Sequence, residues 1–199
     1  MKYMEYKPQT FTIPELDGIS TESVKQHIGL YEGYVKNFNT ITSKLSEYAQ
    51  DPEKNALALA ELMRRRSFEF GGMRLHEHYF PQFEGGAKAL DEKSAFGEQM
   101  LKEYQKMEHF LPYFKMIAGL RGPGWALLYW DPMAKQFVAG WTEEQHLGTH
   151  PLPIILALDV WEHSYVLDYG ASGRGKYIEA FFKNLNWGVM EKRFEALTK

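Results

Sequence analysis

Apolar residues recur every three or four positions through most of the first half of the chain, which is the pattern of amphipathic helices. The pattern runs from 22 to about 48 and again from 56 to about 83. The pair Gly71-Gly72 could break the second stretch. Because only a short segment around Asp51-Pro52 separates the two stretches, they predict an antiparallel helical hairpin.

The second half of the chain follows a linker pattern at 81–86 (PQFEGG) and mixes helical with β-like segments. Its last β-like run is continuously apolar, as expected of a buried strand. We therefore predict an N-terminal unit over residues 1–86 and a C-terminal unit over 87–199. Helices are expected at 89–106, 107–119, 177–187 and 189–197, and strands at 125–130, 136–142 and 154–160.

Composition narrows the class of protein. The chain has 199 residues, 44% of them hydrophobic, and a formal net charge of −3. Its one cationic run, Arg64-Arg65-Arg66, is short, so nucleic acid is not an expected partner. The absence of cysteine excludes disulfides and thiolate metal ligands. With neither a signal-peptide pattern nor an apolar run that could span a bilayer, we expect a cytoplasmic protein without a membrane partner.

A carboxylate and an imidazole stand just beyond the last apolar run, in the segment Asp159-Val-Trp-Glu-His163. A carboxylate that ends a buried strand is costly unless it is paired, hydrogen-bonded or bound to a metal. Taken alone, Asp159 is better explained as the cap of a following helix.

The wider sequence changes that interpretation. The segment DVWEHSYVLDY, which begins at Asp159, resembles the Asp-x-Trp-Glu-His signature of the iron/manganese superoxide dismutases. The segments around His27 (ISTESVKQHIGLYEGYVKNFN) and His76 (FGGMRLHEHYF) are similar to the two ligand helices of that family. Gly122-Pro-Gly-Trp125-Ala resembles its Gly-x-Gly-Trp-Ala turn. Several separated motifs in the same order, over roughly residues 19–190, make a specific signal.

The resemblance implies an α+β fold: an N-terminal α-helical hairpin and a C-terminal domain with a three-stranded antiparallel sheet. It also implies one iron or manganese ion per subunit between the two units, bound by His27, His76, Asp159 and His163. Three imidazoles and one carboxylate are nitrogen and oxygen ligands suited to either metal. The activity that it implies is the conversion of two superoxide ions and two protons to dioxygen and hydrogen peroxide.

In this family a glutamine or histidine side chain hydrogen-bonds the solvent on the metal. It comes from four residues before the second ligand, here Gly72, or from the loop before the third strand, here EEQHLGTH. The spacing of His146 and His150 resembles the archaeal type, so we assign the role to His146; an alignment shifted by one residue would assign it to Gln145. A histidine in this role is associated in the family with iron or with use of either metal, so the resemblance slightly favours iron over manganese.

Other site roles also follow from the resemblance. Tyr34 would be the gate to the metal, Trp125 a wall of the site, and Arg174 either a surface cation or a group that attracts superoxide. Glu162 would reach His163 of a partner subunit, and Tyr165 would lie at the rim of the site and at the subunit boundary. A homodimer or homotetramer is therefore expected.

The chain also departs from the family pattern. His27 and Tyr34 are seven residues apart, one fewer than usual, so we expect an α-helix without the π-bulge that eight residues require. Leu30 and its neighbours stand where the family has a His-His pair that includes a gateway residue. Arg174 follows one inserted residue. Two alternatives therefore remain: a metal-binding relative with weak activity, and a non-enzymatic scaffold that reuses the fold.

Overall fold

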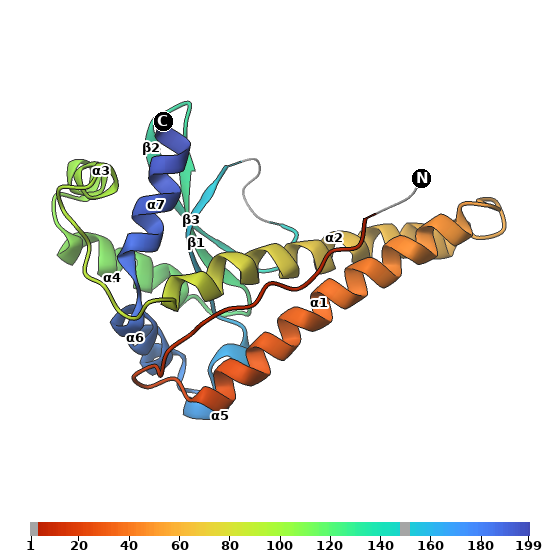
Figure 1. Ribbon diagram of the computed structural model, residues 1–199, viewed down its shortest axis with the longest axis horizontal. Coiled ribbons are helices and arrows are strands. Elements are labelled where there is room, and N and C mark those ends of the chain that lie inside the picture. The colour runs from red at the N-terminus through yellow and green to blue at the C-terminus, as the bar shows by residue number, and fades with distance from the viewer. Residues whose placement is uncertain (1–3, 148–151) are drawn as a thin grey trace.

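The computed structural model describes residues 4–147 and 152–199. Two long antiparallel helices, α1 (Thr21–Tyr48) and α2 (Ala56–Tyr79), form a hairpin that projects from the rest of the molecule (Figure 1). A short 3₁₀ helix, η1 (Phe80–Phe83), continues α2. The hairpin predicted from the apolar spacing is present, with the boundary of its first helix within one residue of the expected one.

Helix α1 buries one face along most of its length. The Ser20 side chain caps it by accepting a hydrogen bond from the Ser23 backbone N–H at 3.1 Å. His27, Tyr31 and Val35 follow at intervals of four residues, which places them on one buried side of the helix. The helix is α-helical throughout, with no π turn, as the spacing from His27 to Tyr34 predicts.

Helix α2 is not broken at Gly71-Gly72, contrary to the break that the sequence suggested. The glycines serve a different purpose, because the loop after the second strand packs directly on the helix there. A Cβ atom at Gly71 would lie 2.1 Å from the backbone oxygen of Gln145. Glycine therefore permits a close approach of two backbones rather than a turn.

The second half of the chain supplies a compact sheet and its covering helices. Strand β1 (Trp125–Asp131) pairs antiparallel with β2 (Gln136–Thr142) on one side and with β3 (Ile154–Asp159) on the other. Trp125 pairs with Asp159, so the first residue of β1 lies beside the last residue of β3. The α+β class and the three-stranded antiparallel sheet are thus confirmed.

The helices of this half differ from those expected at several boundaries: the helix expected at 177–187 spans Arg174–Asn184, and the short helix Val166–Tyr169 was not expected. The helix predicted from 89 begins only at Ala95, because Ser94 caps it by accepting from the Gly97 backbone N–H at 2.9 Å. Figure 1 shows α7 alongside the sheet, with α3, α4 and α6 nearby. The bounds are α3 Ala95–Tyr104, α4 Met107–Ala118, α5 Val166–Tyr169, α6 Arg174–Asn184 and α7 Trp187–Thr198.

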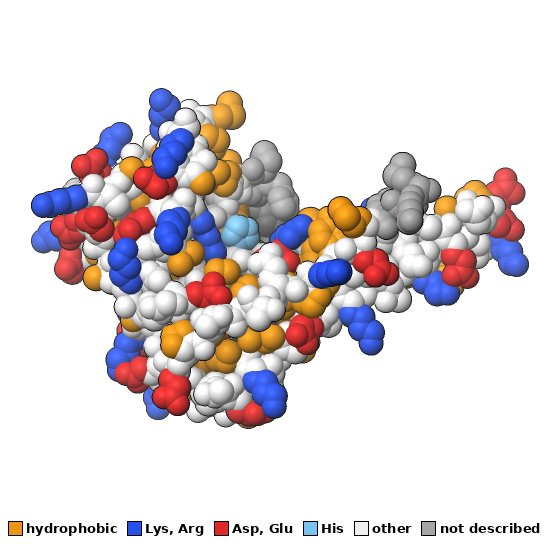
Figure 2. Space-filling view, in the orientation of Figure 1, with side chains coloured by type: hydrophobic (Ala, Val, Ile, Leu, Met, Phe, Trp, Pro, Cys, Tyr) orange, Lys and Arg blue, Asp and Glu red, His pale blue; other side chains and the backbone are white. Residues whose placement is uncertain are grey.

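A buried glutamine joins the two halves beside the site. The Gln82 side chain donates to the Ala157 carbonyl at 2.7 Å and accepts from the Ala157 backbone N–H at 2.9 Å. These two bonds tie η1 to the centre of β3, so the end of α2 and the end of β3 are held in a fixed relation. On the surface, acidic and basic side chains are interspersed over the face seen in Figure 2. Among the described residues no helix is both long and apolar enough to cross a bilayer.

Candidate metal centre

Four side chains from four different elements converge between the hairpin and the sheet. His27 comes from α1, His76 from α2, Asp159 from the end of β3 and His163 from the 3₁₀ helix η2 (Glu162–Ser164). One nitrogen or oxygen of each lies within 4.8 Å of those of the others. His27, His76 and Asp159 are buried, and His163 is half-buried, so this imidazole is the one of the four that faces outward.

The carboxylate of Asp159 is the geometric centre of this cluster. Its Oδ2 atom lies 3.1 Å from Nε2 of His27, 3.1 Å from Nε2 of His163 and 3.6 Å from Nε2 of His76. Its Oδ1 atom accepts a hydrogen bond from the Trp161 backbone N–H at 2.9 Å. One carboxylate oxygen is therefore held by the backbone, while the other faces three imidazole nitrogens.

The hydrogen bonding of His76 leaves one ring nitrogen free. Its Nδ1 atom lies 2.6 Å from the Gly72 carbonyl oxygen, so Nδ1 carries the proton and donates it there. Its Nε2 atom is then unprotonated, and this buried atom has no hydrogen-bond partner. An unpartnered buried nitrogen is costly, and a metal ligand is the ordinary explanation for an imidazole oriented in this way.

Burial and charge set the protonation of the four groups in the direction that metal binding needs. Burial lowers the pKa of His76 to about 3, with the neighbouring His27 adding to the effect. Burial also lowers the pKa of His27, so both imidazoles are neutral at pH 7. Burial alone would raise the pKa of Asp159, but the adjacent imidazoles of His163 and His27 hold it well below its usual value.

His163 shifts in the opposite direction from the other two imidazoles. Burial acts to lower its pKa, but the charge of Asp159 and the hydrogen bond to it outweigh burial and raise the pKa. A metal cation bound at Oδ2 of Asp159 would take the place of the proton on His163, because a ligating imidazole must be neutral. Three neutral imidazoles and one carboxylate are a donor set that fits iron or manganese.

Aromatic rings surround the centre. The Trp125 ring meets the His76 ring edge to face at 5.0 Å between centroids, and the Trp161 ring stacks on His163 at 6.3 Å. The Tyr34 ring lies 5.3 Å from the His76 ring. Trp125 is fully buried, whereas Tyr34 is half-buried and is therefore the more exposed of these two rings.

The loop before β3 places Gln145, not His146, against this centre. Gln145 is buried beside Tyr34 and Gly72, and its amide lowers the pKa of the Tyr34 hydroxyl, although burial raises that pKa overall. Neither amide atom makes a hydrogen bond of regular geometry. A buried amide with unmet hydrogen bonds calls for a partner that the described part of the chain does not supply.

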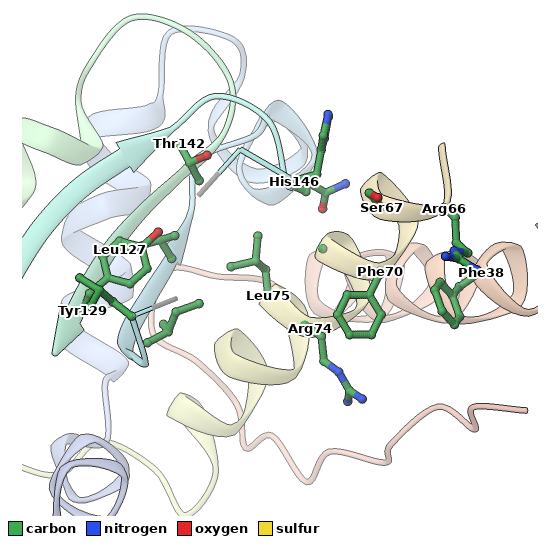
Figure 3. A pocket seen from close by; sticks show the side chains of 14 residues that line it. Phe38, Arg66, Ser67, Phe70, Arg74, Leu75, Leu127, Tyr129, Thr142 and His146 are labelled. Atoms are coloured by element: carbon green, nitrogen blue, oxygen red, sulfur yellow. The ribbon is translucent and has the colours of Figure 1, made fainter. Parts of the chain in front are cut away.

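His146 lies on the outer side of the same loop. Its ring meets the Phe68 ring edge to face at 5.8 Å between centroids. It also lines a cavity of ≈ 570 Å³ between α2 and the sheet. Figure 3 shows its ring directed away from Leu75 at the middle of that cavity. The second histidine of the archaeal-type spacing, His150, lies outside the described residues.

The remaining residues singled out in the sequence lie in varied places. The terminal nitrogens of Arg174 donate to the carbonyl oxygens of Leu120 at 2.6 Å and Gly122 at 2.5 Å, and its guanidinium lies over the Tyr165 ring. Tyr165 is buried, whereas Glu162 is exposed. His78, two residues after His76, is half-buried and does not belong to the four-residue cluster.

One charged residue near the centre, Glu69, was not among the candidates named from the sequence. Glu69 is buried on α2, seven residues before His76 and therefore on the same side of the helix. Its charge acts on the Tyr34 hydroxyl. The position of an acid two helical turns before a candidate ligand was the available signal, but the sequence did not show that this side chain is buried.

Comparison with known proteins agrees with the geometry. Residues 92–193 match the model of the C-terminal domain of iron/manganese superoxide dismutases. The chain is 31% identical to an iron superoxide dismutase of Saccharolobus solfataricus, covering 100% of this chain and 97% of that protein. It is 31% identical to that of Aquifex aeolicus, covering 97% and 90%. It is 32% identical to a manganese superoxide dismutase of Haloferax volcanii, covering 98% and 96%.

The family match and the full-length relatives both rest on stretches of chain that contain Asp159 and His163, and the relatives extend over the hairpin that carries His27 and His76. Iron and manganese proteins are both among them, as the donor set allows. The chain therefore belongs to the iron/manganese superoxide dismutase family.

Proposed function

We propose that this protein is a superoxide dismutase that uses one iron or manganese ion held by His27, His76, Asp159 and His163. The observation that carries the proposal is the convergence of these four donors within 4.8 Å, from elements far apart in the chain. When bound, the metal supplies one-electron redox chemistry, so that two superoxide ions and two protons become dioxygen and hydrogen peroxide.

The buried ligands hold the centre ready for the metal. The Gly72 carbonyl fixes the His76 ring through Nδ1, and the Trp161 backbone N–H fixes the Asp159 carboxylate through Oδ1. Both contacts orient the ligating atom and need no rearrangement when a cation enters. A single anionic ligand among four leaves a net positive charge on a di- or trivalent ion, which attracts a small anion.

Tyr34 and Gln145 are the proposed partners of solvent and substrate in the site. Gln145 is favoured over His146 because its buried amide lies beside Tyr34 and Gly72 and has no regular hydrogen-bond partner of its own. With the Tyr34 pKa raised by burial, the hydroxyl stays protonated at pH 7 and can donate a hydrogen bond. We propose that this pair positions the solvent from which protons reach reduced superoxide.

The other site residues act around this pair. Trp125 and Trp161 wall the centre and exclude bulk water. Because its terminal nitrogens hold the carbonyls of Leu120 and Gly122, we propose that Arg174 supports the turn that leads into Trp125 rather than binding superoxide directly.

We further propose a homodimer, built as in the family pattern. Glu162 is exposed, beside the half-buried His163, where its carboxylate could reach His163 of a second copy. Tyr165 would support that boundary by packing on Tyr177, with 6.0 Å between ring centroids. Pairing of two such dimers would give the homotetramer expected as the alternative.

Location and domain division are also proposals. The absence of cysteine fits the reducing cytoplasm. A division near Gly86, into residues 1–86 and 87–199, is supported by the origin of the donors: two come from the hairpin and two from the second half.

The test of the proposed function is a superoxide assay on protein loaded separately with iron and with manganese. We expect the metal-free protein to be inactive and at least one loaded form to consume superoxide well above the buffer background. Activity at that background in both loaded forms, with one metal ion per chain verified, would refute the proposal.

A further inference from the structure

The three arginine side chains of the run Arg64-Arg65-Arg66 have different surroundings. Arg64 pairs with Glu61 on the exposed surface, at 2.6 Å between its Nη2 and Oε1 of Glu61. Arg66 lines the cavity between α2 and the sheet, near Phe38 (Figure 3). The guanidinium of Arg65 donates from Nε to Oε1 of Glu69 at 2.6 Å. Only the middle arginine of the run is thus bonded to a buried group.

Glu69 is the buried partner that holds the Arg65 guanidinium in place. The Glu69 side chain is 2% exposed, and the Arg65 side chain is 45% exposed. A buried carboxylate is costly without a partner, so Glu69 strongly favours the arrangement that keeps the Arg65 guanidinium over it. In this pair the negative end lies inside the protein and the positive end faces solvent. The terminal nitrogens of Arg65 make no hydrogen bond within the described part of the chain, so they are available to an anion.

A line of rings leads from Arg65 to the metal centre. The Arg65 guanidinium carbon lies 4.2 Å from the centroid of the Phe68 ring. The Phe68 ring lies 6.2 Å from the Tyr34 ring, which in turn lies 5.3 Å from the ring of the ligand His76. The charges of Glu69 and Arg65 both act on the Tyr34 hydroxyl. Arg65, whose side chain is 45% exposed, therefore stands at the solvent end of a line of rings that passes Tyr34 and reaches His76.

We propose that Arg65, held in place by the buried Glu69, is the cation that draws small monovalent anions toward the metal centre past Phe68 and Tyr34. The inference rests on the proposed function, in which superoxide is such an anion, and it adds a residue outside the four ligands and their immediate partners. A fixed positive charge close to a binding site raises the local concentration of an anion and the rate of its capture.

The test uses azide, a small monovalent anion, titrated into the iron-loaded protein and followed by the change in its optical absorption. Arg65→Gln removes the charge, and Arg64→Gln, one residue away and paired on the surface, is the matched control. We expect azide to bind about threefold more weakly to R65Q, as the loss of one charge at moderate distance in a solvated site predicts. R64Q should bind azide as the wild type does.

Two further variants separate charge from folding. Arg65→Lys keeps the charge and should retain most of the azide affinity. The double variant Arg65→Gln/Glu69→Gln leaves no buried unpaired charge, so it should fold and hold iron while still binding azide weakly. The dependence of superoxide consumption on ionic strength should also become shallower in R65Q and in the double variant, but not in R64Q.

Equal azide affinity in R65Q and the wild type, equal losses in R65Q and R64Q, or a wild type that binds no azide would each overturn the inference. A failure of this inference can be told apart from a failure of the proposed function. Azide binding that depends on Arg65, in a protein that does not consume superoxide, would uphold the anion-attracting residue and refute the dismutase activity.

Discussion

The side chain of Gln145 occupies the space that a side chain at Gly72 would need. A Cβ atom at Gly72 would lie 2.8 Å from Oε1 of Gln145 and 2.7 Å from Cδ1 of Tyr34. In the family the solvent partner comes either from the position of Gly72 or from the loop that contains Gln145. The two positions therefore share one space next to Tyr34, and in this chain the side chain of Gln145 fills it.

Gly72→Ala should disturb this place. The added methyl group must displace either the Gln145 amide or the Tyr34 ring, and overpacking of this kind costs about 1–3 kcal/mol of unfolding free energy. We expect a lower midpoint of thermal unfolding and lower activity. Gly29→Ala, at a helical glycine with open space around it, is the control, and should stabilise the protein by about 0.5–1 kcal/mol. Equal effects of the two changes would contradict the packing described.

Gln145→Ala and His146→Ala should have unequal effects. The first removes the buried amide beside Tyr34, and we expect superoxide consumption to fall by about ten- to a hundredfold, the usual cost of losing a partner of the metal environment. The second removes a ring that packs on Phe68 outside the centre, so it should leave the rate nearly unchanged. Steady-state rates at equal metal content decide the question. A larger loss in the histidine variant would restore the assignment suggested by the archaeal-type spacing.

The half-buried His78 predicts that the stability of the fold depends on pH. Burial, with the charges of Arg193 and Arg74, lowers its pKa to about 4, below the value near 6.5 of an unfolded chain. The unfolded state therefore binds more protons below pH 6.5, so this stabilising contribution is complete above pH 6.5 and is lost as the pH falls toward 4. At pH 5 this group alone should cost about 2 kcal/mol relative to pH 7.

Urea unfolding of the metal-free protein at pH 7 and pH 5 measures that cost. His78→Gln should lose less unfolding free energy between the two pH values than the wild type, while the same change at the exposed His109 should not alter the difference. Identical pH dependence in the wild type and the His78 variant would show that this imidazole does not titrate as described.

Glu162→Ala tests the proposed dimer. If the carboxylate reaches His163 of a second copy, its loss should leave that imidazole without its partner and raise the dissociation constant by at least about tenfold. Analytical ultracentrifugation over a range of concentrations measures the shift. Glu179→Ala, at another exposed acid, provides the control. A dimer equally strong in both variants would remove Glu162 from the interface.

Much of this structure follows from local patterns. The helical hairpin could be predicted because its apolar residues repeat at helical spacing over long stretches, and strand β3 because its apolar run is continuous, as in a buried strand. The metal ligands His27, His76, Asp159 and His163 could be named because each stands in a motif whose order along the chain is specific.

The remainder depends on contacts between distant segments. Whether Gln145 or His146 faces the centre is decided by one position in a loop, and the packing of that loop on Gly71-Gly72 is not visible in the sequence. The burial of Glu69 depends likewise on how α1 lies against α2. Its spacing from Arg65 predicts an ion pair, but not that one partner is inside the protein.

The central claim is that four side chains share one metal ion, and anomalous X-ray diffraction tests it most directly. Crystals of the iron- and manganese-loaded protein, measured on either side of each absorption edge, should show a single peak in bonding contact with Nε2 of His27, His76 and His163 and with Oδ2 of Asp159. A peak elsewhere, or one that lacks any of these four donors, would contradict the account.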